Sequence, residues 1–208
     1  LVWQRSLGAE IRVSHVLELI LRLKHICNAH PETGDYATSA AAARRAAGHA
    51  AGGEKLLVFS QFVAAPFGVH AIAARLGRLR PLLLTGGQDA AIRAQAVASF
   101  AQDDGRRAMV LSVRAGGLGL NLTAASVVFH ADLWWTAAVA TQAEDRAHRI
   151  GQARPVQVFA YSCADTIESR IAAIVAREQA LFDMYVEGVD IAALASLDLD
   201  DLLEAVGF

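Results

Sequence analysis

The feature that most constrains the fold is a regular alternation between short apolar runs and segments with helical periodicity. From residue 55 onward the apolar runs lie at 56–60, 82–85, 109–113, 127–130 and 156–162. Strands that are buried on both faces read as continuous apolar runs, and parallel strands need a crossover connection, which is usually a helix. The alternation therefore predicts an α/β fold, a doubly wound parallel sheet with helices on both faces.

The intervening segments of this core are predicted to be helices. They read FVAAPFGVHAIAARLG, DAAIRAQAVASFA and TAAVATQAEDRAHRI. With 208 residues and a hydrophobic content of 54%, the chain is long enough for one well-buried α/β domain.

The regions on either side of the core are also predicted to be helical. The opening residues read as one helix to about His30, and the Ala-rich stretch ATSAAAARRAAGHAAGG is predicted to be a helix rather than a loose connector. Residues 165–186 form an amphipathic pattern that Asp165 could cap, and LDLDDLLEAVGF reads as a short acidic helix. We divide the chain into a helical lead-in and connector (1–54), a core (55–163) and C-terminal helices that close the lobe (164–208).

Several features limit where the protein works. The apolar runs fall well short of the roughly 18 residues that a membrane helix needs, so we expect no membrane association. The opening has no leader with a cleavage site, and the two cysteines, Cys27 and Cys163, show no CxxC spacing. We expect a reducing intracellular compartment. Because the first residue is Leu1 rather than Met, we also expect the chain to be part of a longer protein.

Charge is distributed unevenly along the chain. Residues 1–177 hold all 19 basic residues and 13 acidic ones, whereas 178–208 hold eight acidic residues and no basic one. Arginine accounts for 17 of the basic residues, which favours bidentate phosphate contacts but is equally expected from a biased genomic base composition. The acidic tail is expected to be a solvated helix or to dock onto a basic surface.

A glycine-rich segment, RAGGLGLNLT, follows the apolar run at 109–113. Glycines there would let backbone N–H groups approach a phosphate or nucleotide. The segment is not a dinucleotide-binding fingerprint, because Leu122 stands where the third glycine is needed, and the chain contains no GxxxxGK[ST] loop. From the residues alone, a tight strand-to-helix connection remains an equal alternative.

A second motif, QAEDRAHRIGQ, spans residues 142–152. A helix that begins after Thr136 and ends at Gly151 would place Gln142, Arg146 and Arg149 on one face. Two guanidinium groups on one face suit a concentrated negative charge such as phosphate. The alternative is a solvated face with i,i+4 pairs from Asp145 to Arg149 and from Glu144 to His148.

The order and spacing of several motifs resemble one known family. These motifs are LRLKHICNAHPE, EKLLVFSQF, LLLTGGQDAAIRAQAVASF, AGGLGLNLT, DLWWTAAVATQ, QAEDRAHRIGQ, VQVFAY and TIE. Together they resemble the second motor lobe of the Swi/Snf family, helicase superfamily 2 ATPases that translocate on double-stranded DNA. The resemblance runs from about residue 15 to 185 and implies a RecA-like fold for the core.

The resemblance also implies roles for individual residues. Arg146 and Arg149 match the arginine fingers that reach the γ-phosphate of ATP, while Gly117, Gly119, Asn121 and Gln142 match nucleotide-sensing positions. The positions that match DNA contacts are Ser60, Gln61, Thr85, Gly86, Arg114 and Trp135. Core packing is the equal alternative for Trp135.

Cofactors and partners follow from the same resemblance. ATP and Mg²⁺ would be bound mainly by an amino-terminal RecA-like lobe, so this chain is not expected to hydrolyse ATP alone. The expected partners are double-stranded DNA, that first lobe and a nucleoprotein substrate, in a nucleoid-associated cytoplasmic or nuclear location. Two alternatives are a non-catalytic RecA-like module for DNA binding or protein docking, and a strand-separating helicase.

The chain departs from the family pattern at several positions. Thr136 and Ala137 stand where the family usually has Asn-Pro, and HICNAHPE carries an extra Ala29. His25, Cys27 and His30 resemble metal ligands, but no second pair of ligands follows nearby in the sequence. We predict ordinary packing and capping for them, as for His130 and Asp132, and no metal site.

Overall fold

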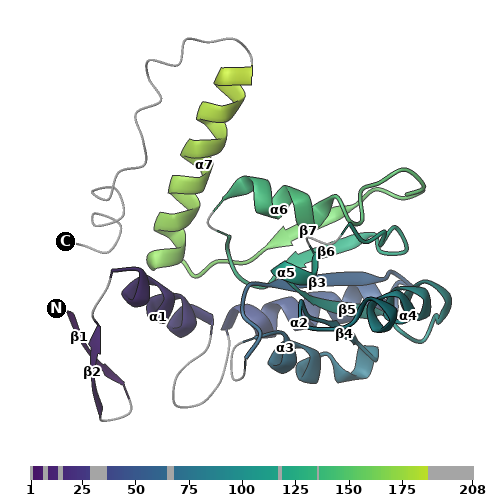
Figure 1. Ribbon diagram of the computed structural model, residues 1–208, viewed down its shortest axis with the longest axis horizontal. Coiled ribbons are helices and arrows are strands. Elements are labelled where there is room, and N and C mark those ends of the chain that lie inside the picture. The colour runs from purple at the N-terminus through teal and green to yellow at the C-terminus, as the bar shows by residue number, and fades with distance from the viewer. Residues whose placement is uncertain are drawn as a thin grey trace.

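The core is a five-stranded parallel sheet with helices on both faces (Figure 1). The computed structural model describes residues 2–6, 9–13, 16–28, 37–64, 68–116, 119–134 and 136–186. The strands lie side by side in the order β4-β5-β3-β6-β7. Their bounds are β3 Leu56–Ser60, β4 Leu82–Leu84, β5 Ala108–Ser112, β6 Val127–His130 and β7 Gln157–Ala160.

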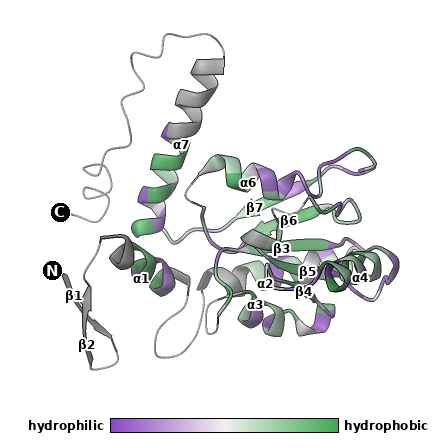
Figure 2. Cartoon of the chain, viewed as in Figure 1, coloured by the Kyte–Doolittle hydropathy of each residue, from purple (hydrophilic) through white to green (hydrophobic). Residues whose placement is uncertain are grey.

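The three central strands explain the continuous apolar runs. Every residue of β3, β5 and β6 is buried, and β3 pairs in parallel with β5 on one side and β6 on the other. Figure 2 shows this centre of the sheet in hydrophobic colours. The edge strand β7 is largely exposed, so its apolar residues are only partly buried in the core. The predicted doubly wound parallel sheet is confirmed.

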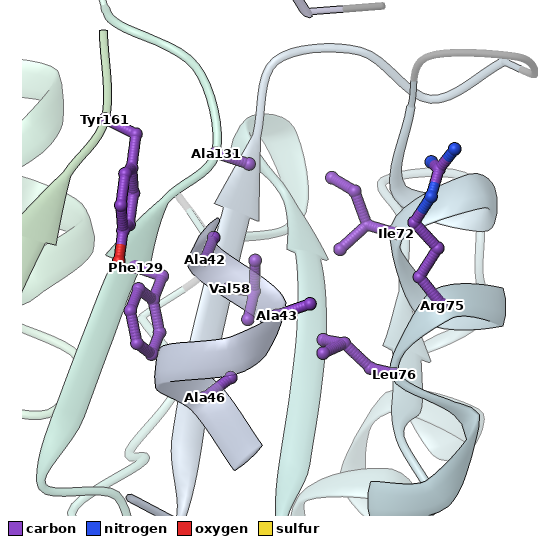
Figure 3. A pocket seen from close by; sticks show the side chains of 10 residues that line it. All are labelled: Ala42, Ala43, Ala46, Val58, Ile72, Arg75, Leu76, Phe129, Ala131 and Tyr161. Atoms are coloured by element: carbon purple, nitrogen blue, oxygen red, sulfur yellow. The ribbon is translucent and has the colours of Figure 1, made fainter. Parts of the chain in front are cut away.

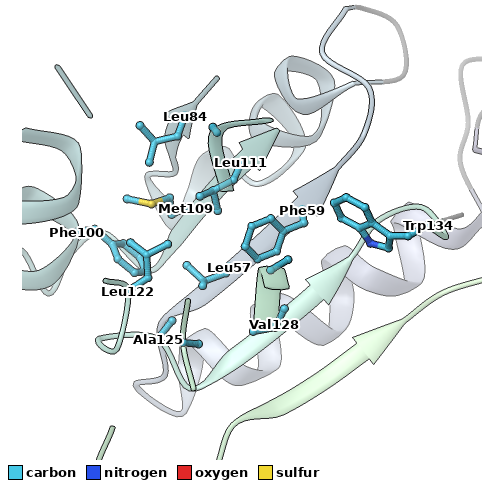
Figure 4. Close-up of a cluster of buried hydrophobic side chains, with 13 residues drawn as sticks. Leu57, Phe59, Leu84, Phe100, Met109, Leu111, Leu122, Ala125, Val128 and Trp134 are labelled. Carbon is cyan, nitrogen blue, oxygen red and sulfur yellow. The ribbon is translucent and has the colours of Figure 1, made fainter. Parts of the chain in front are cut away.

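Each face of the sheet has its own hydrophobic cluster. One face packs against α2 (Ala37–Ala51) and α3 (Val69–Arg75), with Val58 and Phe129 between them. The other face packs against α4 (Ala90–Gln102), α5 (Val113–Gly116) and α6 (Ala137–Glu144). Figure 4 shows the second cluster, in which Trp134 lies at one end beside Phe59.

Two predicted helices are shorter than expected. Among the described residues of the segment 62–77, helix is found at α3 and at the start of a 3₁₀ turn, η1 (Gly77–Leu79), while residues 65–67 lie outside the described residues. Helix α6 begins after Thr136 as predicted but ends at Glu144 rather than at Gly151. Gly151 does have a positive φ of 103°, within the turns that follow.

The first thirteen residues do not form the predicted helix. Strands β1 (Val2–Ser6) and β2 (Ala9–Val13) pair antiparallel, with Val2 opposite Val13. The β-branched residues and a glycine two residues after β1 favour a hairpin over a helix. The predicted helix is confirmed only as α1 (Val16–Asn28), and His30 lies outside the described residues.

Helix α7 (Ile167–Val186) packs on α1 beside the carboxyl ends of the strands (Figure 1). Ile20 of α1 contacts Ile167 and Ile171 of α7. Thr166 caps α7 in place of the predicted Asp165, because Thr166 Oγ1 accepts the Glu168 N–H at 3.2 Å. Asp165 instead has a left-handed φ of 57°. The predicted acidic helix at 197–208 lies outside the described residues.

No helix in these described ranges is long and apolar enough to cross a membrane.

Candidate functional site

The two predicted arginines lie in a compact turn that follows α6, residues 145–152, which we name the arginine turn. The turn is hydrogen-bonded to the loop between β5 and β6. The Leu122 N–H donates to the Arg146 carbonyl at 2.9 Å, and Gln152 Nε2 donates to the carbonyls of Thr123 and Ala125 at 3.1 and 2.7 Å. The glycine-rich segment and the QAEDRAHRIGQ motif are therefore one structural unit.

Arg149 presents its side chain to solvent. One of its donors, Nη1, binds the Gly119 carbonyl at 3.2 Å, and the residue is exposed. A guanidinium carries five N–H donors, so this bond leaves most of the fork available to an anion. Gly119 has a φ of 70°, a conformation that an L side chain rarely adopts.

Arg146 has a different environment. It is only 8% exposed, and its Nε donates to the Gln142 carbonyl at 3.1 Å. Because α6 ends at Glu144, the three predicted residues do not share one helical face as expected; the Gln142 side chain is exposed while that of Arg146 is largely buried. The bond to the Gln142 carbonyl holds the base of the Arg146 side chain against the helix end.

The i,i+4 ion pairs of the alternative interpretation are not found among the described residues, and Glu144 makes a different contact. Glu144 Oε1 lies 2.9 Å from His130 Nε2, at the end of β6. The indole of Trp134 donates to His130 Nδ1 at 2.7 Å, which requires that nitrogen to be the acceptor and places the proton on Nε2, facing Glu144. This chain of contacts links the end of β6 to the last turn of α6.

A second group of predicted residues lies at the carboxyl ends of the strands. Asp132 is 2% exposed, and its carboxylate accepts the Ser60 hydroxyl, the Gln61 N–H at 3.1 Å and Gln61 Nε2 at 2.9 Å. Burial raises the pKa of Asp132, and the hydrogen bonds from Ser60 and Gln61 and the charge of Lys24 oppose that rise. Asp132 thus organises this edge of the sheet.

Ser60 and Gln61 differ in accessibility. Ser60 is 0% exposed, and its hydroxyl also accepts the Phe62 N–H at 3.1 Å. Gln61 is partly exposed and also donates to the Leu133 carbonyl at 3.1 Å. Gln61 is thus the more accessible of the two residues, and their contacts with a ligand stay a prediction.

The remaining predicted residues are partly placed. Thr85 and Gly86 follow β4 at the same edge, and the Thr85 N–H donates to Gln88 Oε1 at 3.0 Å. Asn121 is exposed, with its Oδ1 accepting the Thr123 N–H at 3.3 Å. The backbone of Arg114 lies in α5 directly after β5; its side chain, Gly117 and Trp135 lie outside what the structure describes.

The structure therefore places the predicted residues in two regions. The arginine turn contacts the loop that leads into β6, whereas Gln61, Thr85 and Gly86 lie at the carboxyl edge of the sheet. Sequence reasoning missed the organising roles of Asp132 and Gln152. The position of Gln152 directly after Gly151 was the available signal, since a side-chain amide there can bind carbonyls that the turn leaves free.

An apolar pocket that is open to solvent lies between α2 and α3 (Figure 3). Ala43 and Ala46 of α2, Ile72 of α3 and Phe129 of β6 are among the residues that line it. The pocket is on the face of the sheet opposite α6, so it is separate from the arginine turn.

The sheet order and the two helical layers define a RecA-like α/β lobe, and comparisons with known proteins give the family. Residues 40–151 match the model of the helicase conserved C-terminal domain. The SWI2/SNF2 ATPase core of Sulfolobus solfataricus, solved in complex with dsDNA, superimposes with a TM-score of 0.66 at 26% identity, covering 91% of this chain and 41% of that one. The C-terminal part of the Fun30 ATPase domain superimposes with a TM-score of 0.60 at 25% identity, covering 69% and 47%.

Curated relatives agree with these structures. DNA repair protein RAD5 of Cryptococcus neoformans is 41% identical over 128 residues, which is 61% of this chain and 11% of the relative. ATP-dependent helicase rhp16 of Schizosaccharomyces pombe is 36% identical over 148 residues, 71% of this chain and 17% of the relative. The chain spans between 9% and 17% of the length of the curated relatives reported first. The chain belongs to the helicase C-terminal domain family, in its Swi2/Snf2 group.

Proposed function

We propose that this chain is the second motor lobe of an ATP-dependent double-stranded DNA translocase. The observation that carries the proposal is the arginine turn, in which the Arg149 guanidinium is exposed while the turn itself is hydrogen-bonded to the loop between β5 and β6. A fixed, solvent-facing guanidinium is suited to stabilise charge that develops on a transferring phosphoryl group. Arg149 is the finger in this proposal, and Arg146 holds the turn and completes the positive site.

The residues fit one side of a nucleotide site. The Arg149 fork and the positive-φ backbone at Gly119 suit the phosphates of ATP, and Asn121 and Gln142 are both exposed close to them in sequence. The chain has no P-loop to hold the phosphates itself. ATP and Mg²⁺ would therefore be held mainly by a first lobe, and bound ATP would supply the phosphoryl group that these residues face. The relatives named ATP-dependent helicases support this use of ATP.

The carboxyl edge of the sheet is the proposed DNA-facing surface. Gln61, Thr85 and Gly86 lie there, and the backbone of Arg114 follows β5 at the same edge. The proposed contact from Trp135 rests on the sequence motif alone, because Trp135 lies outside the described residues. Ligands of open α/β sheets bind at this edge. The complex of the related Sulfolobus core with dsDNA supports double-stranded DNA as the partner. A nuclear or nucleoid-associated location follows from that partner, and a nucleoprotein obstacle is the proposed substrate.

A second candidate is a RecA-like module that binds DNA or protein without catalysis. The burial of Arg146 favours it, because an arginine that is 8% exposed and bonded to its own helix end could serve the fold alone. The two candidates differ in whether loss of the exposed fork changes ATP turnover.

The test is DNA-stimulated ATPase activity in a two-lobed protein that joins this chain to a functional first lobe. We expect Arg149→Ala to lower turnover by about 10³-fold or more, since an arginine finger contributes roughly 10³ to 10⁵ in rate. We expect the thermal unfolding temperature of the Arg149→Ala protein to stay near that of the wild type. Arg146→Ala should lower both turnover and unfolding temperature.

The matched control is Arg154→Ala. Arg154 is also exposed and also donates to a carbonyl of the same loop, that of Ala124, at 3.3 Å. It should leave turnover unchanged. Wild-type turnover in the Arg149→Ala protein would reject the motor proposal and leave the non-catalytic module.

A further inference from the structure

Three potential metal ligands from distant parts of the chain meet beside the carboxyl edge of the sheet. Cys27 lies at the end of α1, Cys163 in the loop after β7, and Glu168 in the first turn of α7. Their sulfur and carboxylate oxygen atoms all lie within 4.8 Å of one another. Around a tetrahedral zinc ion, with Zn–S near 2.3 Å and Zn–O near 2.1 Å, ligand atoms would be about 3.5–3.8 Å apart. Small side-chain rotations would bring these atoms to that spacing.

Glu168 shows that the cluster is incomplete as it stands. Its side chain is 0% exposed, and Oε2 accepts the Cys163 N–H at 3.0 Å. The other oxygen, Oε1, is buried and has no hydrogen-bond partner among the residues that the structure describes. A buried carboxylate oxygen without a partner is unfavourable by about 1–3 kcal/mol or more, so such an atom in a native protein calls for a ligand.

A buried ammonium lies beside the cluster. Lys24 is buried near both Asp132 and Glu168, so one ammonium faces two carboxyl groups. Burial raises the pKa of Glu168, and it raises the pKa of Cys163 to about 11. A bound metal must therefore displace protons from these groups. Cys163 Sγ at present donates to the Cys27 carbonyl at 3.3 Å.

We propose that Cys27, Cys163 and Glu168 form a zinc-binding site that ties α1 to the start of α7. Two thiolates select a soft or borderline divalent cation over Mg²⁺ or Ca²⁺. On binding, each thiol releases its proton to solvent and forms a Zn–S bond. Glu168 releases any proton that it holds and bonds through Oε1, and water supplies the fourth ligand. The two thiolates and one carboxylate leave one net negative charge, and the Lys24 ammonium lies beside it.

The proposed site includes Cys27, for which the sequence predicts ordinary packing. The sequence predicts no metal site at His25, Cys27 and His30, because no second pair of ligands lies nearby in the sequence. His25 does pack edge-on against Phe62, with ring centroids 4.5 Å apart. Cys163 and Glu168 lie more than 130 residues further along the chain than Cys27, and they come close to it because α7 packs on α1.

Metal binding by the whole chain, purified under reducing conditions and freed of metal by a chelator, tests the proposal. Cobalt(II) is the spectroscopic probe, because thiolate ligands give it an intense near-ultraviolet charge-transfer band. We expect one cobalt per chain with that band, displacement of cobalt by zinc, and a rise in unfolding temperature with zinc. We also expect zinc to protect both cysteines from alkylation by iodoacetamide, as read by mass spectrometry.

The variants separate a metal site from a merely packed cluster. Cys27→Ser and Cys163→Ser should each weaken cobalt binding by about 100-fold or more and remove much of the thiolate band, since even outer-shell changes weaken metal sites by about 10- to 100-fold. Glu168→Gln should weaken binding while the band persists. Asp104→Asn, at an exposed carboxylate, is the control and should bind as the wild type does.

The wild-type measurements decide the matter even if a variant fails to fold. Absence of the thiolate band, or alkylation of both cysteines at an unchanged rate in saturating zinc, would overturn the proposal. Unchanged cobalt binding in folded Cys27→Ser and Cys163→Ser proteins would do the same. These readouts use neither ATP nor DNA, so they stand apart from the proposed motor function.

Discussion

At the scale of single residues, Asp132 has the largest organising role. It accepts hydrogen bonds from both Ser60 and Gln61 at the end of the central strand. At 2% exposure, its position leaves no room for water to serve as the acceptor in its place. Removing the acceptor would leave the buried Ser60 hydroxyl and the Gln61 N–H without it, and an unpaired buried donor is unfavourable by about 1–3 kcal/mol. The accessible Gln61 side chain keeps its orientation through this carboxylate.

We predict that Asp132→Ala lowers the free energy of unfolding by about 2–4 kcal/mol at neutral pH, because the donors of Ser60 and Gln61 lose their acceptor. Asp132→Asn should lower it less, since the amide oxygen can still accept from Gln61. Urea denaturation measures both. Equal losses in the two variants would show that the carboxylate charge, rather than its acceptor geometry, holds the edge.

The same residue gives a prediction for pH dependence. The folded pKa of Asp132 is raised above 3.8 by burial, so the native state binds more protons than the unfolded state between these two pKa values. The free energy of unfolding should therefore fall as pH rises through that interval, and Asp132→Asn should flatten the fall. Glu168, whose pKa is raised by burial in the same way, will retain part of the slope.

Glu54 provides a control of opposite sign. A hydrogen bond with His49 lowers the pKa of Glu54, so its contribution to stability is present above pH 4.5 and is lost as pH falls through its folded pKa. Glu54→Gln should lessen the loss of stability on acidification. A Glu54→Gln curve that changes in the same sense as the Asp132→Asn curve would contradict both assignments.

At the scale of elements, the early end of α6 shapes the proposed site. A helix continued to Gly151 would have carried Arg149 away from the Gly119 carbonyl to which it is bonded. Instead, the chain turns after Glu144, and the Gln152 side chain pins the turn to the carbonyls of Thr123 and Ala125. The turn needs one residue with a positive φ, and Gly151 provides it at 103°.

Two glycine substitutions test this element with opposite expected signs. Gly151→Ala should lower the free energy of unfolding by about 1 kcal/mol or more, because alanine is strained at that φ although no atom lies within 4 Å of its Cβ. Gly48→Ala, inside α2 and equally unobstructed, should raise it by about 0.5–1 kcal/mol. Thermal and urea unfolding measure both, and a shift of the same sign in the two variants would refute the backbone argument.

At the scale of the whole molecule, the residues proposed to face ATP and those proposed to face DNA lie in different regions. The arginine turn lies on the face covered by α6, and the proposed DNA-facing residues lie at the carboxyl edge of the sheet. In the proposed motor, the phosphate-facing and DNA-facing groups lie in separate places. Among the described residues, the loop between β5 and β6 and the contact of His130 with Glu144 connect the two regions.

We predict that DNA binding by the two-lobed protein weakens linearly with salt on logarithmic axes and depends little on sequence, since the contacts are with phosphates. Arg114→Ala should reduce the salt slope by about one unit. Arg149→Ala should leave the slope unchanged, because this arginine belongs to the nucleotide side. Fluorescence anisotropy with two unrelated duplexes of equal length measures this, and a slope that Arg149→Ala alters as much as Arg114→Ala would contradict the division.

How much could be predicted depended on how local each feature is. The apolar runs at 56–60 and 127–130 match β3 and β6 residue for residue, because a strand that is buried on both faces appears as a continuous apolar run in the sequence. The prediction of a helix at the opening residues was wrong, because they form a hairpin. Short runs with Val, Ile and Arg are compatible with both helical and strand periodicity over a few residues. Here pairing with a second strand adds to the β propensity of the β-branched residues, and a pattern read along one segment does not show that pairing.

The sequence by itself determined the parallel sheet, its helical layers and the family, because periodicity and motif order are properties of neighbouring residues. Only the tertiary structure decided that Ser60 is buried under Asp132, that the two arginines differ in exposure, and that Cys27 meets Cys163 and Glu168. Each of these depends on how elements far apart in the chain pack together. Packing fixes which side chains meet, and no local pattern records it.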